Sequence, residues 1–377
     1  MSHERQFQIF TKPVSDSCNL SCSYCYYHLS SSNKRQRNSL VENDSFLKEY
    51  IKQHIEATTS GTVFFSWHGG EPMLAGIDFY KKAVELQRQF LPLGKKLLNG
   101  IQTNGTLLSD DWCQFLSDNN FIAGISIDGP GHLHNSYRKT KTGQDTFDKV
   151  VAGFRLLQQH KVTTEILCVV SACNEDYPIE VYRFFKQIGA RFITFLPLVN
   201  QIGTSGKADK MSVNAAAFGR FLIAVFDEWV QNDIGKIDVQ IFEEALRSAF
   251  DNEHTLCIFK QNCGGVPVIE SNGDFYSCDH FVNNEFLVGN IEEHSLAELL
   301  DCEKQVSFGL LKSTTLPAFC KRCEVLKMCN GECPKNRFLI SPDGESGLNY
   351  LCDGYRMFFN HCQPLIEEIR KAVTSGF

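Results

Sequence analysis

The sequence has no long hydrophobic segment and no excess of positive charge. No stretch approaches the ~18 uncharged apolar residues of a transmembrane helix. The N-terminal MSHERQFQIFTKPVSD lacks the apolar core and small-residue cleavage site of a secretory signal. With 37 Lys and Arg against 44 Asp and Glu, the net charge of −7 argues against a nucleic-acid-binding surface. We therefore expect a cytoplasmic protein with neither a membrane nor a nucleic-acid partner.

Cysteine is the exception in an otherwise ordinary globular composition. The 377 residues include 16 cysteines, too many for an average enzyme and too few for a small disulfide-rich scaffold. In a reducing compartment, abundant cysteine indicates metal binding or redox catalysis. Ten of the sixteen lie after residue 256, so we expect more metal sites in a C-terminal domain than in an N-terminal one.

The first two thirds of the chain alternate short apolar runs with helical patterns. We predict strands at 62–68, 122–128, 164–170 and 192–198, and helices at 43–57, 77–90, 146–160, 179–189, 215–230 and 242–251. The polar segment 201–212 is typical of a loop. Strands that alternate with helices favour parallel βαβ units, and therefore an α/β fold with a doubly wound sheet or a barrel. Such folds carry their chemistry on the loops that follow the strands.

Three cysteines lie close together near the N-terminus, in the segment CNLSCSYCYY. Cys18, Cys22 and Cys25 have the spacing C-x3-C-x2-C. Three thiolates on one short loop can bind three irons of a cubane and leave the fourth iron open to an exchangeable ligand. Zinc is the alternative, with His28 as a fourth ligand. The spacing alone leaves both open.

With the aromatic Tyr24 before its last cysteine, this loop resembles the signature of the radical S-adenosylmethionine (SAM) enzymes. The resemblance implies a partial (β/α)6 barrel, over residues 8–235 here. In that family the open iron chelates the methionine group of SAM, and the cluster cleaves the sulfonium to a 5′-deoxyadenosyl radical. The resemblance places SAM contacts at Tyr24 and, further along the chain, at Gly69, Gly70, Glu71, Ser126, Asp128, Arg138 and Leu196. Glycines let a backbone approach a ligand closely, and Glu71 can accept a hydrogen bond from an ammonium group.

The C-terminal cysteines form a second pattern. Eight of them make two complete four-ligand sets, sufficient by count for two zinc ions or two cubanes. The pattern resembles the SPASM domain of peptide-modifying radical enzymes, which carries auxiliary [4Fe–4S] clusters. By this resemblance the first cluster is bound by Cys257, Cys263, Cys278 and Cys333, and the second by Cys320, Cys323, Cys329 and Cys352.

We therefore expect three [4Fe–4S] clusters and two domains. The radical SAM domain spans residues 1–235, and the SPASM domain, which ends in a helix, spans residues 236–377. Five cysteines are left over, and we interpret them as core or surface thiols without a role: Cys113, Cys168, Cys173, Cys302 and Cys362.

Longer stretches narrow the resemblance. FSWHGGEPMLAGIDFY, QTNGTLLSDDWC, NGDFYSCDHF, CPKNRF and GLNYLCDGY are similar to the anaerobic sulfatase-maturating enzymes, and the likeness runs from about Gln8 to beyond Cys352. It implies oxidation of a cysteine or serine Cβ in a nascent or unfolded sulfatase, at a C/S-x-P/A-x-R motif, to Cα-formylglycine. A flavodoxin or ferredoxin would donate electrons, and we expect a monomer. Asp279, directly after Cys278, would be the general base, and His280 is a weaker candidate.

Two alternatives stay open. A SPASM maturase that makes thioether or carbon–carbon crosslinks often carries an N-terminal leader-binding domain, and only 17 residues precede Cys18 here, which favours sulfatase maturation. A zinc-dependent structural protein would leave the Gly-Gly-Glu motif without a purpose.

His68 stands where many relatives carry glutamine, and Asn135 where aspartate is frequent. The preference for a cysteine or a serine peptide is therefore open.

Overall fold

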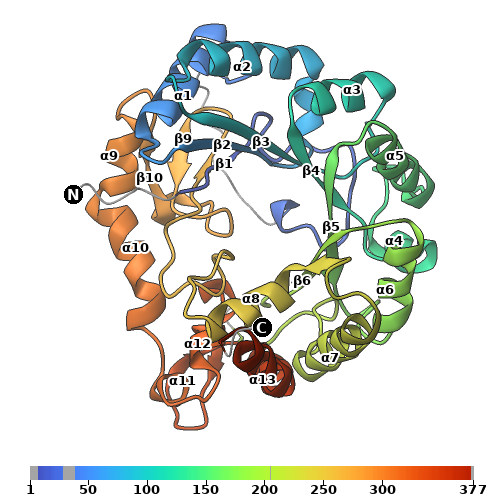
Figure 1. Cartoon of the computed structure of the whole chain (residues 1–377). Helices are drawn as coiled ribbons and strands as arrows, with labels where there is room; N and C mark the ends of the chain where they lie inside the picture. The colour runs from blue at the N-terminus through green and yellow to red at the C-terminus, as the bar shows by residue number, and fades with distance from the viewer. Residues whose placement is uncertain (1–6, 29–38, 204, 375–377) are drawn as a thin grey trace. The chain divides into compact units, whose positions relative to one another are not determined.

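The computed structural model describes residues 7–28, 39–203 and 205–374 (Figure 1). The chain divides into two compact units that are built from interleaved segments. Unit 1 comprises Met1–Ser126, Arg138–Thr164 and Gly264–Gly309, and unit 2 comprises Ile127–Tyr137, Glu165–Cys263 and Leu310–Phe377. Because the units interleave, no single cut separates them, and the domain division at residue 235 stays a prediction.

Unit 1 is built on a mostly parallel sheet. Its parallel strands follow the order β1 (Phe10–Thr11), β2 (Thr62–Trp67), β3 (Lys96–Thr103) and β4 (Phe121–Ser126). On the other side of β1 lie the parallel β8 (Val268–Ile269) and then the antiparallel β9 (Asp274–Tyr276) and β10 (Leu287–Asn290). Short strands from the C-terminal third thus extend a sheet that the N-terminus begins.

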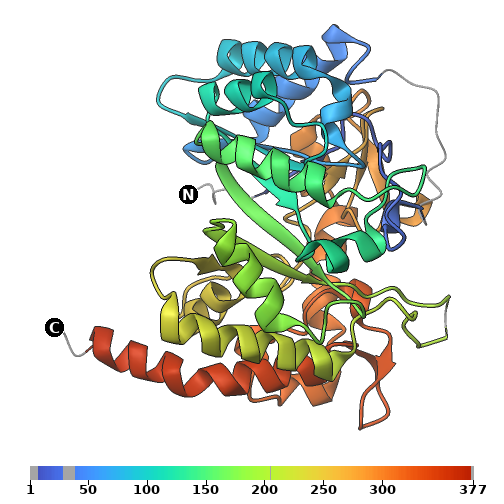
Figure 2. The same ribbon diagram turned by 90° about the vertical axis from the view of Figure 1, so that its right-hand side faces the viewer.

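Helices cover the strands of unit 1 (Figures 1 and 2). They are α1 (Asp44–Ala57), α2 (Ile77–Phe90), α3 (Asp110–Asp118), α5 (Phe147–Gln159) and α9 (Leu296–Asp301). α1 begins at a side-chain cap, because Asn43 accepts hydrogen bonds from the backbone N–H of Ser45 and Phe46. Aromatic side chains fill the core beneath, where the rings of Trp67 and Tyr80 meet edge to face at 5.5 Å.

Unit 2 holds the remaining parallel strands and the C-terminal helix. Its strands are β5 (Thr163–Val170), of which Thr163 and Thr164 are assigned to unit 1, β6 (Phe192–Pro197) and β7 (Asp238–Val239). Its longer helices are α6 (Pro178–Gln187), α7 (Ala215–Asn232), α8 (Gln240–Ala249) and α13 (Cys352–Thr374). α7 and α13 lie side by side (Figures 1 and 2). Their backbones are so close that a Cβ atom at Gly354 would lie 2.1 Å from the carbonyl oxygen of Ala215.

Shorter elements carry the sites described below. In unit 1 they are the 3-10 helices η1 (Tyr26–His28), η2 (Pro72–Ala75) and η3 (Asn284–Phe286). In unit 2 they are α4 (Gly131–Tyr137), α11 (Ala318–Lys321), α12 (Leu326–Cys329), η4 (Pro334–Asn336) and the hairpin of β11 (Leu339–Ile340) and β12 (Ser346–Leu348). α10 (Glu303–Thr314) begins in unit 1 and ends in unit 2.

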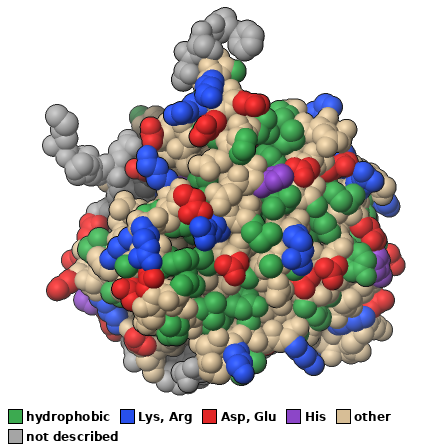
Figure 3. Space-filling model, turned by 90° about the horizontal axis from the view of Figure 1, so that it is seen from below, with side chains coloured by type: hydrophobic (Ala, Val, Ile, Leu, Met, Phe, Trp, Pro, Cys, Tyr) green, Lys and Arg blue, Asp and Glu red, His purple; other side chains and the backbone are tan. Residues whose placement is uncertain are grey.

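The predicted strands and helices are confirmed, and their bounds differ from the prediction by at most two residues. β4 ends at Ser126, so Asp128 lies in the following loop and not in the strand. Within the described residues, no helix is long and apolar enough to span a membrane. On the face shown in Figure 3, side chains of both charges are interspersed with hydrophobic ones, in keeping with the small net charge.

Candidate active site and cluster sites

The segment that leads to the first cysteine is held in place by two glycines. The backbone N–H of Gly70 donates a hydrogen bond to the carbonyl oxygen of Ser15 (2.9 Å). A Cβ atom at Gly70 would lie 2.3 Å from the carbonyl oxygen of Ser17, and one at Gly69 would lie 2.6 Å from that of Ser15. Only glycine fits at both positions. The close approach that the structure shows is therefore to the chain that leads to Cys18.

Cys18, Cys22 and Cys25 follow β1 on one short segment, and all three are half-buried. The backbone N–H of Leu20 (3.4 Å) and the side-chain amide of Asn104 (3.7 Å) both lie within hydrogen-bonding distance of the Cys18 sulfur. Burial raises the pKa of the Cys18 thiol, and these two donors oppose the increase. The segment thus presents three thiols and N–H donors, which is a donor set that fits a three-cysteine cluster loop.

Glu71 links the loop after β2 to the turn after β3. Its buried carboxylate accepts hydrogen bonds from the Thr103 hydroxyl (2.8 Å) and from the backbone N–H groups of Met73 (3.1 Å) and Asn104 (2.7 Å). Burial raises the pKa of Glu71 to about 7, although the three hydrogen bonds oppose this. Asn104 in turn donates to Asn19 beside the first cysteine (2.8 Å). Glu71 therefore supports the cysteine segment, and its contact with SAM stays a prediction.

Two further predicted SAM contacts, Arg138 and Tyr24, lie together in unit 1. The Arg138 guanidinium is 5.4 Å from the centre of the Tyr24 ring, and both side chains are buried. The carbonyl oxygen of the neighbouring Lys139 accepts a hydrogen bond from the backbone N–H of Ser21 (2.9 Å), which ties this loop to the cysteine segment. Ser126, at the end of β4, accepts a hydrogen bond from the side chain of Gln102 (3.2 Å).

Asp128 and Leu196 belong to unit 2. The Asp128 carboxylate, 3% exposed, accepts a hydrogen bond from the backbone N–H of Val169 (3.0 Å), and its carbonyl oxygen accepts one from Asn174 (3.1 Å). The side chain therefore joins the loop after β4 to β5, a structural role that the sequence did not indicate. Leu196 lies in β6 opposite Val169 and is half-buried. For both residues the contact with SAM stays a prediction.

Asp279, the predicted general base, lies in unit 1 with three polar partners. Its Oδ1 atom is 2.5 Å from the Lys12 ammonium nitrogen, which also lies 2.9 Å from Glu270 Oε1. Its Oδ2 atom accepts hydrogen bonds from the hydroxyls of Tyr26 and Tyr27, the latter at 3.0 Å. Lys12 and Asp279 are only 1% and 8% exposed. The structure thus places a buried carboxylate beside the predicted cluster ligand that precedes it.

Lys12 and the two carboxylates beside it, Asp279 and Glu270, stabilise each other in their charged forms. Burial alone would raise the pKa of Asp279, but the charge and hydrogen bond of Lys12, with the hydrogen bond from Tyr26, lower it to about 2. Burial opposes the charge on Lys12, but the carboxylates of Asp279 and Glu270 raise its pKa above the ordinary value. Asp279 is therefore ionised at neutral pH. His280, the weaker candidate, packs its ring edge-on against Tyr26 at 5.4 Å.

Sequence reasoning missed the partners of Asp279. Lys12 follows β1, and Tyr26 and Tyr27 form η1 directly after the third cysteine. The two tyrosines are visible in CNLSCSYCYY, but the hydrogen bond from Tyr27 to Asp279 spans 252 residues. No local sequence pattern predicts a contact between residues so far apart in the chain, so it is seen only in the folded structure.

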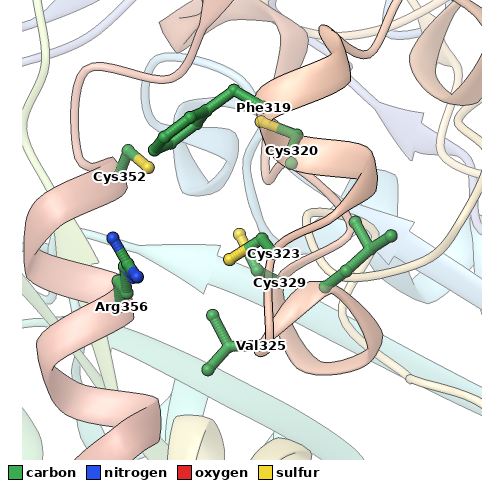
Figure 4. Close-up of a pocket in the computed structure, with 9 residues that line it drawn as sticks. Phe319, Cys320, Cys323, Val325, Cys329, Cys352 and Arg356 are labelled. Carbon is green, nitrogen blue, oxygen red and sulfur yellow. The ribbon is translucent and has the colours of Figure 1, made fainter. Parts of the chain in front are cut away.

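The four cysteines of the predicted second auxiliary set line one pocket in unit 2 (Figure 4). They are Cys320, Cys323, Cys329 and Cys352. Phe319, Val325 and Arg356 also line this pocket. Burial raises the pKa of the Cys329 and Cys352 thiols to about 12, so an ionised thiol there needs a cation. A [4Fe–4S] cluster with all four irons bound by the protein requires four thiolates around one space, and this donor set fits that requirement.

The predicted first auxiliary set is divided between the two units. Cys257, Cys263 and Cys333 belong to unit 2, and Cys278 belongs to unit 1. Burial, helped by the neighbouring Cys263, raises the pKa of Cys257 to about 11. In the described part of the chain, no three His, Cys, Asp or Glu side chains are arranged to hold a single metal ion. The assignment of this ligand set stays a prediction.

The five remaining cysteines lie in the core or near the surface. Three are fully buried: Cys113, Cys168 and Cys362. Cys173 and Cys302 are half-buried.

Two parts of the chain match family models. Residues 13–185 match the radical SAM superfamily, and residues 257–324 match the iron–sulfur cluster-binding SPASM domain. Each match lies inside one of the two predicted domains. Together with the parallel sheet and the thiol sets, they define a radical SAM enzyme. Its cofactors are SAM with a [4Fe–4S] cluster and auxiliary iron–sulfur clusters, which removes the zinc alternative.

Relatives narrow this class. The chain is 42% identical to a serine-type anaerobic sulfatase-maturating enzyme from Bacteroides thetaiotaomicron, over 97% of this chain and 92% of that protein. It is 32% identical to a cysteine-type enzyme from Clostridium perfringens, over 94% of this chain and 96% of that one. A solved structure described as native anSMEcpe with bound AdoMet and Cp18Cys peptide matches with a TM-score of 0.86 and 31% identity, over 97% of this chain and 98% of that one. The chain belongs to the anaerobic sulfatase-maturating enzymes.

Proposed function

We propose that this chain oxidises the Cβ of a cysteine or serine in a nascent or unfolded sulfatase to the aldehyde of Cα-formylglycine. The observation that carries the proposal is the buried, ionised Asp279 next to the predicted cluster ligand Cys278, in a chain of this family. A carboxylate beside an electron acceptor suits a substrate carbon that must lose both a proton and an electron.

The clusters and SAM, when bound, supply the deoxyadenosyl radical that takes the Cβ hydrogen and an acceptor for the second electron. The chain supplies the proton acceptor, because the target thiol or hydroxyl must release its proton as its carbon becomes a carbonyl or thiocarbonyl. A positioned carboxylate within hydrogen-bonding distance accelerates such a transfer by about 10²–10⁴-fold. Water then hydrolyses a thiocarbonyl: it supplies the oxygen of the same aldehyde, and the sulfur leaves as hydrogen sulfide.

Lys12 and Tyr26 set the basicity of Asp279. The charge and hydrogen bond of Lys12, with the hydrogen bond from Tyr26, hold its pKa near 2 against the effect of burial, which makes it a weak base in this state. We infer that a substrate hydroxyl or thiol takes the place of one tyrosine hydroxyl at Oδ2. The hydrogen bond at that position would then come from the proton that is to be transferred, and one of the tyrosine donors that favour the ionised carboxylate would be gone.

The remaining assignments follow from the family resemblance. We propose that SAM contacts Tyr24, Gly69, Gly70, Glu71, Ser126, Asp128, Arg138 and Leu196, and that the substrate is recognised by a C/S-x-P/A-x-R motif. We also propose that a flavodoxin or ferredoxin donates the electrons and that the protein is a monomer. We propose that it is located in the cytoplasm, where reducing conditions keep thiols available for iron.

The test is an anaerobic assay of iron-reconstituted protein with SAM, a strong reductant and one of two peptides that differ only in cysteine or serine at the target position. Mass spectrometry follows deoxyadenosine and the peptide together. We expect deoxyadenosine with an aldehyde-bearing peptide, and the two peptides compared side by side give the preference. Deoxyadenosine with a crosslinked or unchanged peptide would contradict sulfatase maturation.

A further inference from the structure

One short turn joins the two predicted auxiliary cluster sites. Cys329 belongs to one ligand set and Cys333 to the other, and three residues separate them. All three have left-handed backbone, with φ of 46° at Asn330, 70° at Gly331 and 53° at Glu332. Glycine adopts this conformation freely and asparagine fairly readily, but for Glu332 it carries a steric cost that the surroundings must offset. Neighbouring groups must therefore hold the turn in this shape.

Arg337 is the group that holds it. Its Nε atom donates to the carbonyl oxygen of Gly331 (2.7 Å), and its Nη2 atom donates to those of Asn330 (2.9 Å) and Glu332 (3.3 Å). Its Nη1 atom donates to the carbonyl oxygen of Lys312 (2.6 Å). The planar guanidinium thus binds all three carbonyls of the turn at once and ties the turn to α10, which a lysine ammonium with its compact geometry cannot do.

The packing around the turn also restrains it. A Cβ atom at Gly331 would lie 2.4 Å from Arg337 Nη2 and 2.3 Å from a methyl carbon of Leu316. The buried Glu332 carboxylate accepts hydrogen bonds from Asn336 (3.1 Å) and Asn349 (2.5 Å). The turn is therefore fixed both by its backbone and by its side chains.

Arg337 also lies close to thiols of both sets. Burial lowers its pKa, whereas the thiols of Cys329, from the second set, and Cys263, from the first, oppose this. A guanidinium keeps its charge even when it is buried, so it offsets part of the negative charge that the thiolates would bring.

We propose that Arg337 is a positioning residue that fixes Cys329 and Cys333 relative to each other and so couples the assembly of the two auxiliary clusters. The proposal rests on the ligand assignment above. Without the guanidinium, three consecutive carbonyls lose their donor and the left-handed turn relaxes. One ligand of each set then moves, and both clusters lose a ligand from a single substitution.

The experiment compares Arg337→Met with wild type after anaerobic reconstitution. Wild type with three clusters carries about twelve irons per chain, because each [4Fe–4S] cluster holds four. We expect Arg337→Met to keep about four irons and its peptide-independent cleavage of SAM to deoxyadenosine, while the electron paramagnetic resonance signals of the auxiliary clusters disappear. Arg337→Lys keeps the positive charge, so it perturbs folding less than Arg337→Met does. We expect it to lose the same irons, because a lysine lacks the planar guanidinium that donates to several carbonyls at once.

Arg183→Met is the matched control. Arg183 is an arginine of α6 whose exposed side chain pairs with Glu228 (2.9 Å), and its variant should keep all the iron. Wild-type iron content in Arg337→Lys, or loss of about four irons in place of about eight in either Arg337 variant, would overturn the coupling. Cys320→Ala and Cys257→Ala test the ligand assignment separately. If neither lowers the iron content, the ligand assignment is wrong, and the coupling through Arg337, which rests on it, is overturned as well.

Discussion

Lys12 is the residue whose removal most directly tests the electrostatics of the site. Its ammonium pairs with Asp279 at 2.5 Å and with Glu270 at 2.9 Å, and its side chain is 2% exposed. Lys12→Met keeps the apolar stem of the side chain and removes the charge. Two buried carboxylates then face each other without a cation. Removing one partner of a buried ion pair costs about 3–5 kcal/mol, because the other charge stays buried and uncompensated.

The pKa of Asp279 gives a second route to this magnitude. A value of about 2, against an ordinary value of 3.8, corresponds to roughly 2–3 kcal/mol of stability at neutral pH. Because the folded-state pKa lies below the unfolded one, this contribution is present above about pH 4 and is lost as the pH falls toward 2. The cost of an uncompensated buried charge and the lowered pKa of Asp279 both predict that Lys12→Met lowers the free energy of unfolding by several kcal/mol.

Urea unfolding of the anaerobically reconstituted protein measures the loss, as a lower midpoint with an unchanged slope. Lys81→Met is the control, since Lys81 pairs with Asp78 at 3.2 Å on the surface, where both side chains are mostly exposed. Such a pair contributes about 0–1 kcal/mol. A Lys12→Met variant as stable as the Lys81→Met variant would show that the buried ion pair of Lys12 does not stabilise the fold.

Three further predictions concern the base, the cysteine segment and the iron. Asp279→Asn should lower formylglycine formation by about 10²–10⁴-fold while SAM is still cleaved, as mass spectrometry of both products will show; equal loss of deoxyadenosine would contradict a role in proton transfer. Gly70→Ala places a Cβ atom 2.3 Å from Ser17 and should abolish SAM cleavage, whereas Gly61→Ala, with no atom within 4 Å, should keep it. Removal of iron by a chelator should lower the melting temperature, because metal binding contributes to folding; an unchanged melting temperature would argue against clusters that support the fold.

The parts of the fold that have a local signature were predictable. The strands β2, β4, β5 and β6 are long enough to show β-branched and aromatic enrichment, and their bounds were found within two residues. β1, β8 and β9 have two or three residues each, too few to show any periodicity. Their pairing, which brings the C-terminal third into the sheet of unit 1, is a property of the tertiary structure.

In the site, too, features with a short local spacing were predictable from the sequence, and contacts between distant segments were not. The thiols of Cys18, Cys22 and Cys25 must surround one group, so their spacing is short and visible in the sequence. The pairing of Lys12 with Asp279 requires only that two distant segments meet, and many spacings would serve it. The turn between the auxiliary sites was predictable only in part. The segment CPKNRF resembles the family in sequence, but nothing in the sequence assigns a role to its arginine.

Isotope transfer tests most directly whether this enzyme oxidises the Cβ of a cysteine or serine in a sulfatase peptide. A peptide with both hydrogens of that Cβ replaced by deuterium is incubated anaerobically with SAM and the reconstituted enzyme. We expect one deuterium in each deoxyadenosine that forms together with an aldehyde-bearing peptide. Deoxyadenosine free of deuterium, or deuterated deoxyadenosine with a product that is not an aldehyde, would contradict it.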